Sequence, residues 1–190
     1  MSSTESSEAH HLKIVKAIKS GQSAICASIL SPSISLIQEL IVHTIPEPEE
    51  GAPRMIILCL NNILAQELAN QLAPFIKERD LTLDLLLEKG NKVKQRNDLY
   101  DGTEIIVGTS RRVCEMYFQN GFNISKLKLF VVLKLDEQVK YGWLGFIGRI
   151  AESLPKCKQV LFLTSFDDER ITNYVDQFMP PHQLIIESEL

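Results

Sequence analysis

The sequence predicts one three-layer α/β domain in which a doubly wound, mainly parallel sheet lies between two layers of helices. Two observations predict this fold. Short apolar runs of strand length alternate with stretches of helical periodicity along almost the whole chain. The strand-length runs are apolar at successive positions, as strands covered on both faces must be. With 190 residues and 45% hydrophobic composition, the chain can build one domain with a sizeable core.

The elements follow one another in a regular order. Residues 1–11 are predicted to form a disordered polar tail, and residues 46–53, rich in Pro and Glu, a solvated loop. The predicted strands cover residues 24–27, 55–60, 81–87, 104–107, 127–133, 159–163 and 183–186. The predicted helices cover residues 12–18, 36–44, 64–77, 93–100, 113–120, 144–153 and 169–178. We therefore expect residues 12–190 to form a single domain.

Composition restricts the classes of partner. The formal net charge is −4, so a nucleic acid could be held only by a local basic surface. The cysteines form no C-x-x-C pair and the histidines show no ligand spacing, so we expect no metal and no other cofactor. No apolar run is long enough to span a membrane, and the Ser- and Glu-rich start lacks the basic residues of a secretory signal. We expect a cytoplasmic protein without a membrane partner, with the nucleus and RNA granules as alternative locations.

The order and spacing of the elements between Leu12 and Ile186 resemble the first RecA-like domain of DEAD-box RNA helicases. The sharpest match is G-T-S-R-R-V at residues 108–113, where the family carries T-P-G-R after a strand. Gly21 precedes the first strand, as a glycine does before the family's phosphate loop. Residues 164–166, T-S-F, follow a later strand at the place of the family's S-A-T. The resemblance implies a RecA-like, P-loop-type fold for nearly the whole chain.

The same resemblance implies a degenerate nucleotide pocket. Counted from Gly21, the family's T-G-x-G-K-T loop falls on residues 30–35. Phosphoryl transfer from ATP needs the loop lysine and the loop amides to hold the phosphates. Here the lysine position is Ile34, and Pro32 removes a backbone N–H donor from the anion cradle. The altered loop positions are Ser31, Pro32, Ser33, Ile34 and Ser35.

Two registers are open for the D-E-A-D motif. Without gaps it falls on residues 133–136, which puts Leu133 at the magnesium aspartate and Lys134 at the catalytic glutamate. A register with a short insertion sets it on residues 136–139 and keeps both acids, Asp136 and Glu137. We favour the first register because it needs no insertion. Carboxylates at a helix start are also a common structural feature.

RNA contacts are implied at two loops, where the family touches the sugar-phosphate backbone with amides, hydroxyls and arginines. The P-T-R-E-L-A loop reads L-N-N-I-L-A at residues 60–65, and a reading shifted by one helical turn finds E-L-A at residues 67–69. The candidate RNA-binding residues are Asn61, Asn62, Gly90, Thr109, Ser110, Arg111 and Arg112. Two arginines at a helix start can equally be solvated side chains, so the RNA binding we expect is weak.

These departures predict a catalytically inactive helicase-like domain that is not an enzyme and acts as a protein-interaction or RNA-binding scaffold. Degenerate domains of this kind are similar to those found beside Tudor domains in small-RNA silencing factors, which implies RNA metabolism or silencing and at least one protein partner. The alternative is the first lobe of an ATP-dependent RNA helicase that uses Asp136 and Glu137 and needs a second lobe absent from this chain. A third hypothesis is an unrelated doubly wound domain.

Overall fold

The computed structural model describes residues 3–49, 51–179 and 181–186, and side chains from residue 8 onward. The strands are β1 (Ser23–Ala27), β2 (Met55–Cys59), β3 (Leu83–Leu86), β4 (Ile105–Thr109), β5 (Leu129–Val132), β6 (Lys158–Leu163) and β7 (His182–Ile186). Within the described residues they form one sheet in the order β3-β4-β2-β5-β6-β1-β7. All of its pairings are parallel. The predicted α/β fold is confirmed.

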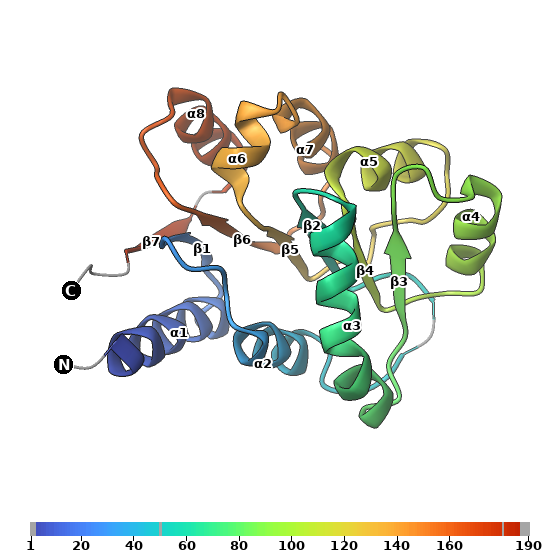
Figure 1. The fold of residues 1–190 in the computed structure, drawn as a ribbon, viewed down its shortest axis with the longest axis horizontal. Helices are drawn as coiled ribbons and strands as arrows, with labels where there is room; N and C mark the ends of the chain where they lie inside the picture. The colour runs from blue at the N-terminus through green and yellow to red at the C-terminus, as the bar shows by residue number, and fades with distance from the viewer. Residues whose placement is uncertain (1–2, 50, 180, 187–190) are drawn as a thin grey trace.

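Helices cover both faces of this sheet (Figure 1). One layer consists of α1 (Ser3–Lys19), α2 (Ile34–Thr44) and α3 (Asn62–Glu78). The other consists of α5 (Ser110–Phe118), α6 (Leu135–Lys140), α7 (Leu144–Ala151) and α8 (Glu169–Phe178), with α4 (Lys92–Tyr100) packed beside β3. No described helix combines the length and the apolar character needed to cross a bilayer.

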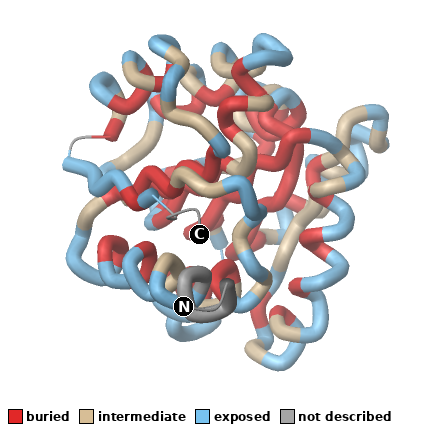
Figure 2. The backbone as a smooth tube through the Cα atoms, turned by 60° about the vertical axis from the view of Figure 1, so that its left-hand side comes forward, coloured by how far each residue is buried: buried red, intermediate tan, exposed pale blue. Residues whose placement is uncertain are grey.

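The central strands are buried on both faces (Figure 2). On β2, Met55 and Ile57 point into the core under α1–α3, whereas Ile56 and Leu58 point into the core under α5–α8. The same alternation divides the residues of β4, β5 and β6 between the two cores. This double burial is why these strands read as unbroken apolar runs in the sequence.

Two elements differ from the prediction. α1 begins at Ser3, so the expected polar tail is helical from there on, while residues 1 and 2 lie outside the described residues. His11 explains part of this extension, because its Nε2 lies 2.8 Å from Oε2 of Glu39 on α2 and ties the helix to its neighbour. α6 was not predicted, since its six residues are too few to show helical periodicity.

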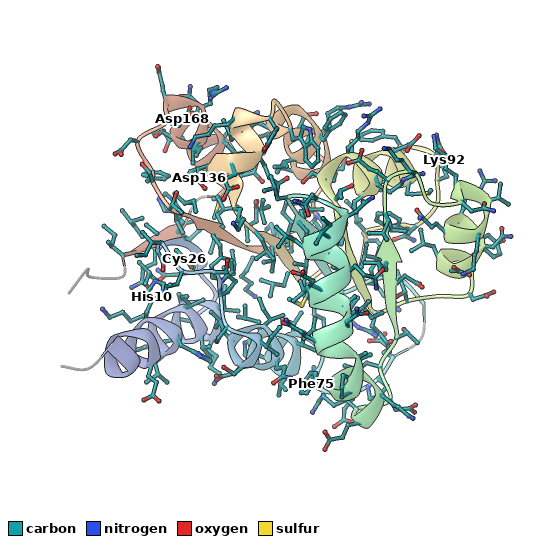
Figure 3. The ribbon with its side chains drawn as sticks, viewed as in Figure 1. His10, Cys26, Phe75, Lys92, Asp136 and Asp168 are labelled. Carbon is teal, nitrogen blue, oxygen red and sulfur yellow. The ribbon has the colours of Figure 1, made fainter. Side chains whose placement is uncertain are left out.

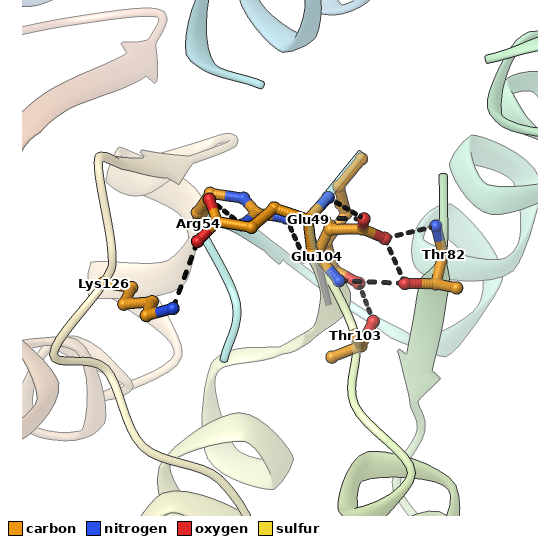
Figure 4. A network of polar contacts seen from close by, with 7 residues as sticks. Glu49, Arg54, Thr82, Thr103, Glu104 and Lys126 are labelled. Carbon is orange, nitrogen blue, oxygen red and sulfur yellow. Dashed lines mark hydrogen bonds and ion pairs between the residues drawn. The ribbon is translucent and has the colours of Figure 1, made fainter. Parts of the chain in front are cut away.

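A buried polar network closes the side of the sheet at which the strands begin, which we call the amino edge (Figure 4). Arg54, only 1% exposed, places Nη1 2.7 Å from Oε2 of Glu49 and Nη2 3.4 Å from Oε1 of Glu104. Glu104 accepts hydrogen bonds from the backbone N–H groups of Glu49 at 3.0 Å and of Thr82 at 2.6 Å. The hydrogen bond from Lys126, with the charge of Arg54, holds the pKa of Glu49 below its ordinary value. The network fastens the loop before β2 to the starts of β3 and β4.

Candidate functional site

A cavity of about 170 Å³ opens on the side of the sheet at which the strands end, which we call the carboxyl edge. Parallel α/β sheets usually bind ligands there. The loop between β1 and α2 forms one wall, and the ends of β2, β5 and β6 form the floor. Further lining comes from Leu64, Glu67, Leu68 and Gln71 of α3. Of the predicted pocket residues, the cavity brings together Ser31, Pro32, Ile34, Leu133 and Lys134.

The other two loop serines serve the start of α2. Ser33 is the N-cap, and its Oγ accepts a hydrogen bond of 3.2 Å from the N–H of Leu36. Ser35 is exposed, and its hydroxyl lies 3.0 Å from that of Ser33. The N–H of Leu30 donates to Oγ of Ser28. Side chains of the loop therefore use amide donors that a phosphate loop would direct at its ligand.

The segment after β5 turns sharply into α6. Lys134 adopts the left-handed conformation, with φ 52° and ψ 48°, and its Nζ lies 3.0 Å from Oε1 of Glu137. Asp136, labelled in Figure 3, lies in the first turn of α6 and accepts a hydrogen bond from the hydroxyl of Thr164. Its Oδ1 has no hydrogen-bond partner among the described residues. Leu133 and Lys134 line the cavity, whereas Asp136 and Glu137 do not.

The candidate RNA-binding segments meet beside the ends of β2, β3 and β4. The amide of Asn62 at the start of α3 donates to the carbonyl of Glu88 at 2.8 Å and accepts from its N–H at 2.9 Å. On α5, Arg112 donates to the carbonyl of Gly90 over 3.5 Å. Nη1 of Arg111 lies 3.9 Å from Oε2 of Glu88. Three segments that are far apart in the sequence are thus joined around the loop after β3.

Several of these candidates are used internally. Asn61 caps α3 by accepting from the N–H of Leu64 at 2.9 Å. Thr109 caps α5, and Ser110 donates to the amide oxygen of Gln138; both residues are fully buried. The side chain of Arg112 is 4% exposed, against 63% for Arg111. The expectation that both arginines face RNA therefore needs correction, because the loop after β3 covers Arg112.

Comparison with known proteins identifies the family. The family model described as DEAD/DEAH box helicase matches residues 7–165. The chain belongs to this family. The ATP-dependent RNA helicase RhlB of Pseudoalteromonas atlantica is 28% identical over 111 residues, which are 58% of this chain and 26% of that protein. The ATP-dependent RNA helicase DeaD of Escherichia coli is 26% identical over 160 residues, which are 83% of this chain and 24% of that protein. The chain spans about a quarter of the length of these relatives.

Solved structures show the same fold. A DEAD box protein from Methanococcus jannaschii matches with a TM-score of 0.85 and 16% identity over 94% of this chain and 49% of that chain. Dbp5 of S. cerevisiae, in a structure bound to Nup159 and Gle1, matches with a TM-score of 0.74 and 20% identity over 95% of this chain and 52% of that chain. Together with the family match, these likenesses identify a RecA-like first domain and argue against an unrelated doubly wound domain.

Membership of this family corrects the prediction that the chain is not an enzyme. The family is enzymatic, and the matched curated relatives are named ATP-dependent RNA helicases. The prediction treated each departure from the motifs as the loss of an activity. A departure at one position describes the local chemistry of that position, whereas an activity belongs to the assembled site.

The residues around the cavity do not fit the magnesium nucleoside triphosphate that helicases use. Ile34 contributes to the lining from the first turn of α2, and Leu133 contributes from just after β5. Among the described residues that line the cavity, Lys134 is the one cation, and Glu137 already pairs with it. The described lining of the cavity therefore offers a triphosphate fewer charged partners than phosphoryl-transfer sites use.

Sequence reasoning missed much of the cavity's lining. Leu60 follows β2, Phe162 lies near the end of β6, and Leu64 lies in the first turn of α3. The signal that could have found the first two is their place at the carboxyl ends of strands in a parallel sheet. The motif comparison had assigned Leu60 and Leu64 to the predicted RNA-contact loop at residues 60–65, and Phe162 only to a strand.

Proposed function

We propose that this chain is a scaffold lobe in RNA metabolism that binds single-stranded RNA weakly and a protein partner more firmly. The observation that carries the RNA part is the junction of three segments at the ends of β2, β3 and β4. Hydrogen bonds join Asn62 to Glu88 and Arg112 to Gly90. A surface built from three fixed segments can follow a sugar-phosphate backbone without reading bases.

The charges on this surface account for weak binding. Lys89, Lys92 and Arg111 are exposed basic side chains on or beside the junction. Glu88 lies beside Arg111, and Glu115 pairs with Lys92. The hydrogen bond from Lys92 lowers the pKa of Glu115, so this glutamate is ionised at neutral pH and competes with phosphate. The surface therefore attracts RNA only modestly and in a salt-dependent way.

A protein partner is supported by a structural neighbour and by the surface. Dbp5 has been solved bound to Nup159 and Gle1. On this chain Tyr141 is exposed, and its ring centroid lies 6.3 Å from that of Trp143, a pairing of side chains often found at interfaces. We further propose a cytoplasmic setting and small-RNA silencing as the process. The four free cysteines support the first, and the likeness to Tudor-associated domains supports the second.

Fluorescence anisotropy with a labelled single-stranded RNA tests the RNA part. We expect binding that weakens as salt rises, and a weaker complex for Arg111→Ala. If Arg111 contacts one phosphate, its removal reduces the slope of log affinity against log salt by about 0.7. Lys16→Ala removes one exposed positive charge from α1, in the opposite helix layer, and is the matched control. Equal effects of the two substitutions would show that only net charge matters and would contradict the proposed surface.

A second candidate function is the activity named for the curated relatives, ATP-dependent RNA unwinding, and family membership favours it. RNA-stimulated phosphate release from ATP by the whole protein tests it. Phosphate release that exceeds the rate without RNA would support this candidate. Its absence, with RNA binding retained, would favour the scaffold.

A further inference from the structure

The cavity at the carboxyl edge has an apolar interior. Its wall and floor include Ile34, Ile37, Leu60, Leu133 and Phe162. Burial raises the pKa of the Cys59 thiol, which also lines the cavity, to about 12. The interior thus disfavours charged groups and favours apolar ones.

The mouth of the cavity is also partly apolar. Ile29 and Leu30 of the loop after β1 line it while remaining 72% and 61% exposed. Two neighbouring large aliphatic side chains held in solvent beside a concave apolar surface are typical of a binding site. An occupant of the cavity would remove part of both side chains from water.

Polar groups lie at the rim of the cavity, where they can hydrogen-bond one end of a ligand whose other end is inside. Ser31 and Thr164 are exposed lining residues with hydroxyl groups. The hydroxyl of Thr164 already donates to Asp136 and can only accept from a ligand. Lys134 and Glu67, of opposite charge, both contribute to the lining, so no net charge selects for an ion. A ligand with one hydroxyl or amide group can hydrogen-bond here without leaving a charge unpaired.

The geometry points to a binding site for a small, uncharged, mainly apolar molecule carrying one hydrogen-bonding group, placed where helicases hold a triphosphate. The volume fixes the scale. A dry apolar cavity of about 150 Å³ accommodates benzene, and this cavity measures about 170 Å³. The enclosed part of the cavity can therefore take one aromatic ring or a branched aliphatic group, and the rest of the ligand lies toward the open mouth. This inference does not depend on the proposed RNA-binding surface.

Saturation-transfer NMR with benzyl alcohol tests the site, with ATP and Mg²⁺ as the second probe. For the wild-type chain we expect saturable transfer to benzyl alcohol that added ATP and Mg²⁺ does not displace. Ile34→Lys puts a charge into the cavity and should weaken benzyl alcohol binding at least tenfold. Ile63→Lys is the matched control, because Ile63 is exposed in the first turn of α3 and is not part of the lining. This control should bind benzyl alcohol as the wild type does.

Each remaining outcome decides the question. Absence of saturable binding to the wild type, equal binding to Ile34→Lys, or displacement by ATP would overturn the inference. If Ile34→Lys does not fold, judged by its circular dichroism, Leu30→Lys at the exposed mouth replaces it with the same expected direction. Ile34→Lys and Leu30→Lys each add a positive charge away from the proposed RNA surface, so each should bind RNA at least as well as the wild type. Failure of the cavity to bind benzyl alcohol is therefore distinguishable from failure of the RNA surface.

Discussion

The two edges of the sheet use charge in opposite ways. At the amino edge, Arg54, Glu104 and Glu49 form a network whose arginine is almost completely buried. At the carboxyl edge, where parallel sheets usually bind ligands, the cavity is lined by residues such as Ile34 and Leu133. Charge thus supports the fold at one edge and is scarce in the lining of the cavity at the other. The comparison teaches that the RecA-like fold does not depend on the polar chemistry of its usual site.

The two edges also differ in the residue types that hold a left-handed backbone. At the amino edge these are Asp80 and Asn120, which adopt it more readily than lysine. Glu104 satisfies donors from two separate loops at the amino edge. At the carboxyl edge, Lys134 is held in the left-handed region, with φ 52°, which costs free energy for a residue with a Cβ atom. Residues in such conformations gather at ligand sites. The amino edge is therefore expected to contribute most of the polar stabilisation, and the carboxyl edge to carry more of the strain.

The largest expected effect comes from breaking the amino-edge network. Arg54→Met removes the buried guanidinium and leaves Glu104 without its cation. We expect the free energy of unfolding to fall by about 3–5 kcal/mol, because an unpaired buried charge remains. Urea denaturation followed by circular dichroism measures it. Adding Glu104→Gln should recover part of the loss, since the unpaired charge is then gone.

Lys126→Ala is the control for this prediction. Lys126 also contacts Glu49, with Nζ 3.1 Å from Oε1, but both side chains are more than half exposed. Its loss should leave the urea midpoint close to that of the wild type. If Arg54→Met were as mild as Lys126→Ala, the amino edge would not be the stabilising region, and the comparison would fail.

A smaller effect is expected from the polar contact behind the cavity. Gln138 is fully buried; it accepts from the hydroxyl of Ser110 and donates to the carbonyl of Leu133 at 2.8 Å. Gln138→Ala leaves both groups without this partner and should cost about 1–3 kcal/mol in urea denaturation. Gln66→Ala removes an exposed bond to Asn70 and should change stability by no more than about 0.5 kcal/mol. A loss as large as that of Arg54→Met would show that the two edges contribute equally.

Most of the fold could be predicted from the sequence because the central strands are buried on both faces. β2 is an unbroken apolar run and β6 is apolar from Val160 to Leu163, and their predicted bounds lie within one residue of those observed. α6 could not be predicted, because it has fewer than two turns. The start of α1 was misplaced because the contact between His11 and Glu39 joins residues 28 positions apart. Tertiary contacts of this kind leave no local pattern.

The site could be predicted only in part. The resemblance assigned Ile34 and Pro32 to one pocket, and both residues line the cavity. It could not show that Arg112 is buried while Arg111 is exposed. That difference depends on the loop after β3, whose Gly90 carbonyl accepts from Arg112 across 22 positions of sequence. Adjacent residues of the same type therefore received the same predicted role.

The smallest expected effect would measure the strain at the carboxyl edge. Asn adopts the left-handed conformation more readily than Lys, so Lys134→Asn should stabilise the chain, by less than about 1 kcal/mol. The gain is limited, because the substitution also removes the contact of Lys134 with Glu137. Lys140→Asn, in the last turn of the same helix, has no left-handed backbone to relieve and should not stabilise the chain. Destabilisation by both substitutions in urea would mean that Lys134 fits its turn without strain. A gain for Lys134→Asn alone would show that the edge bearing the cavity keeps a conformation that stability does not favour.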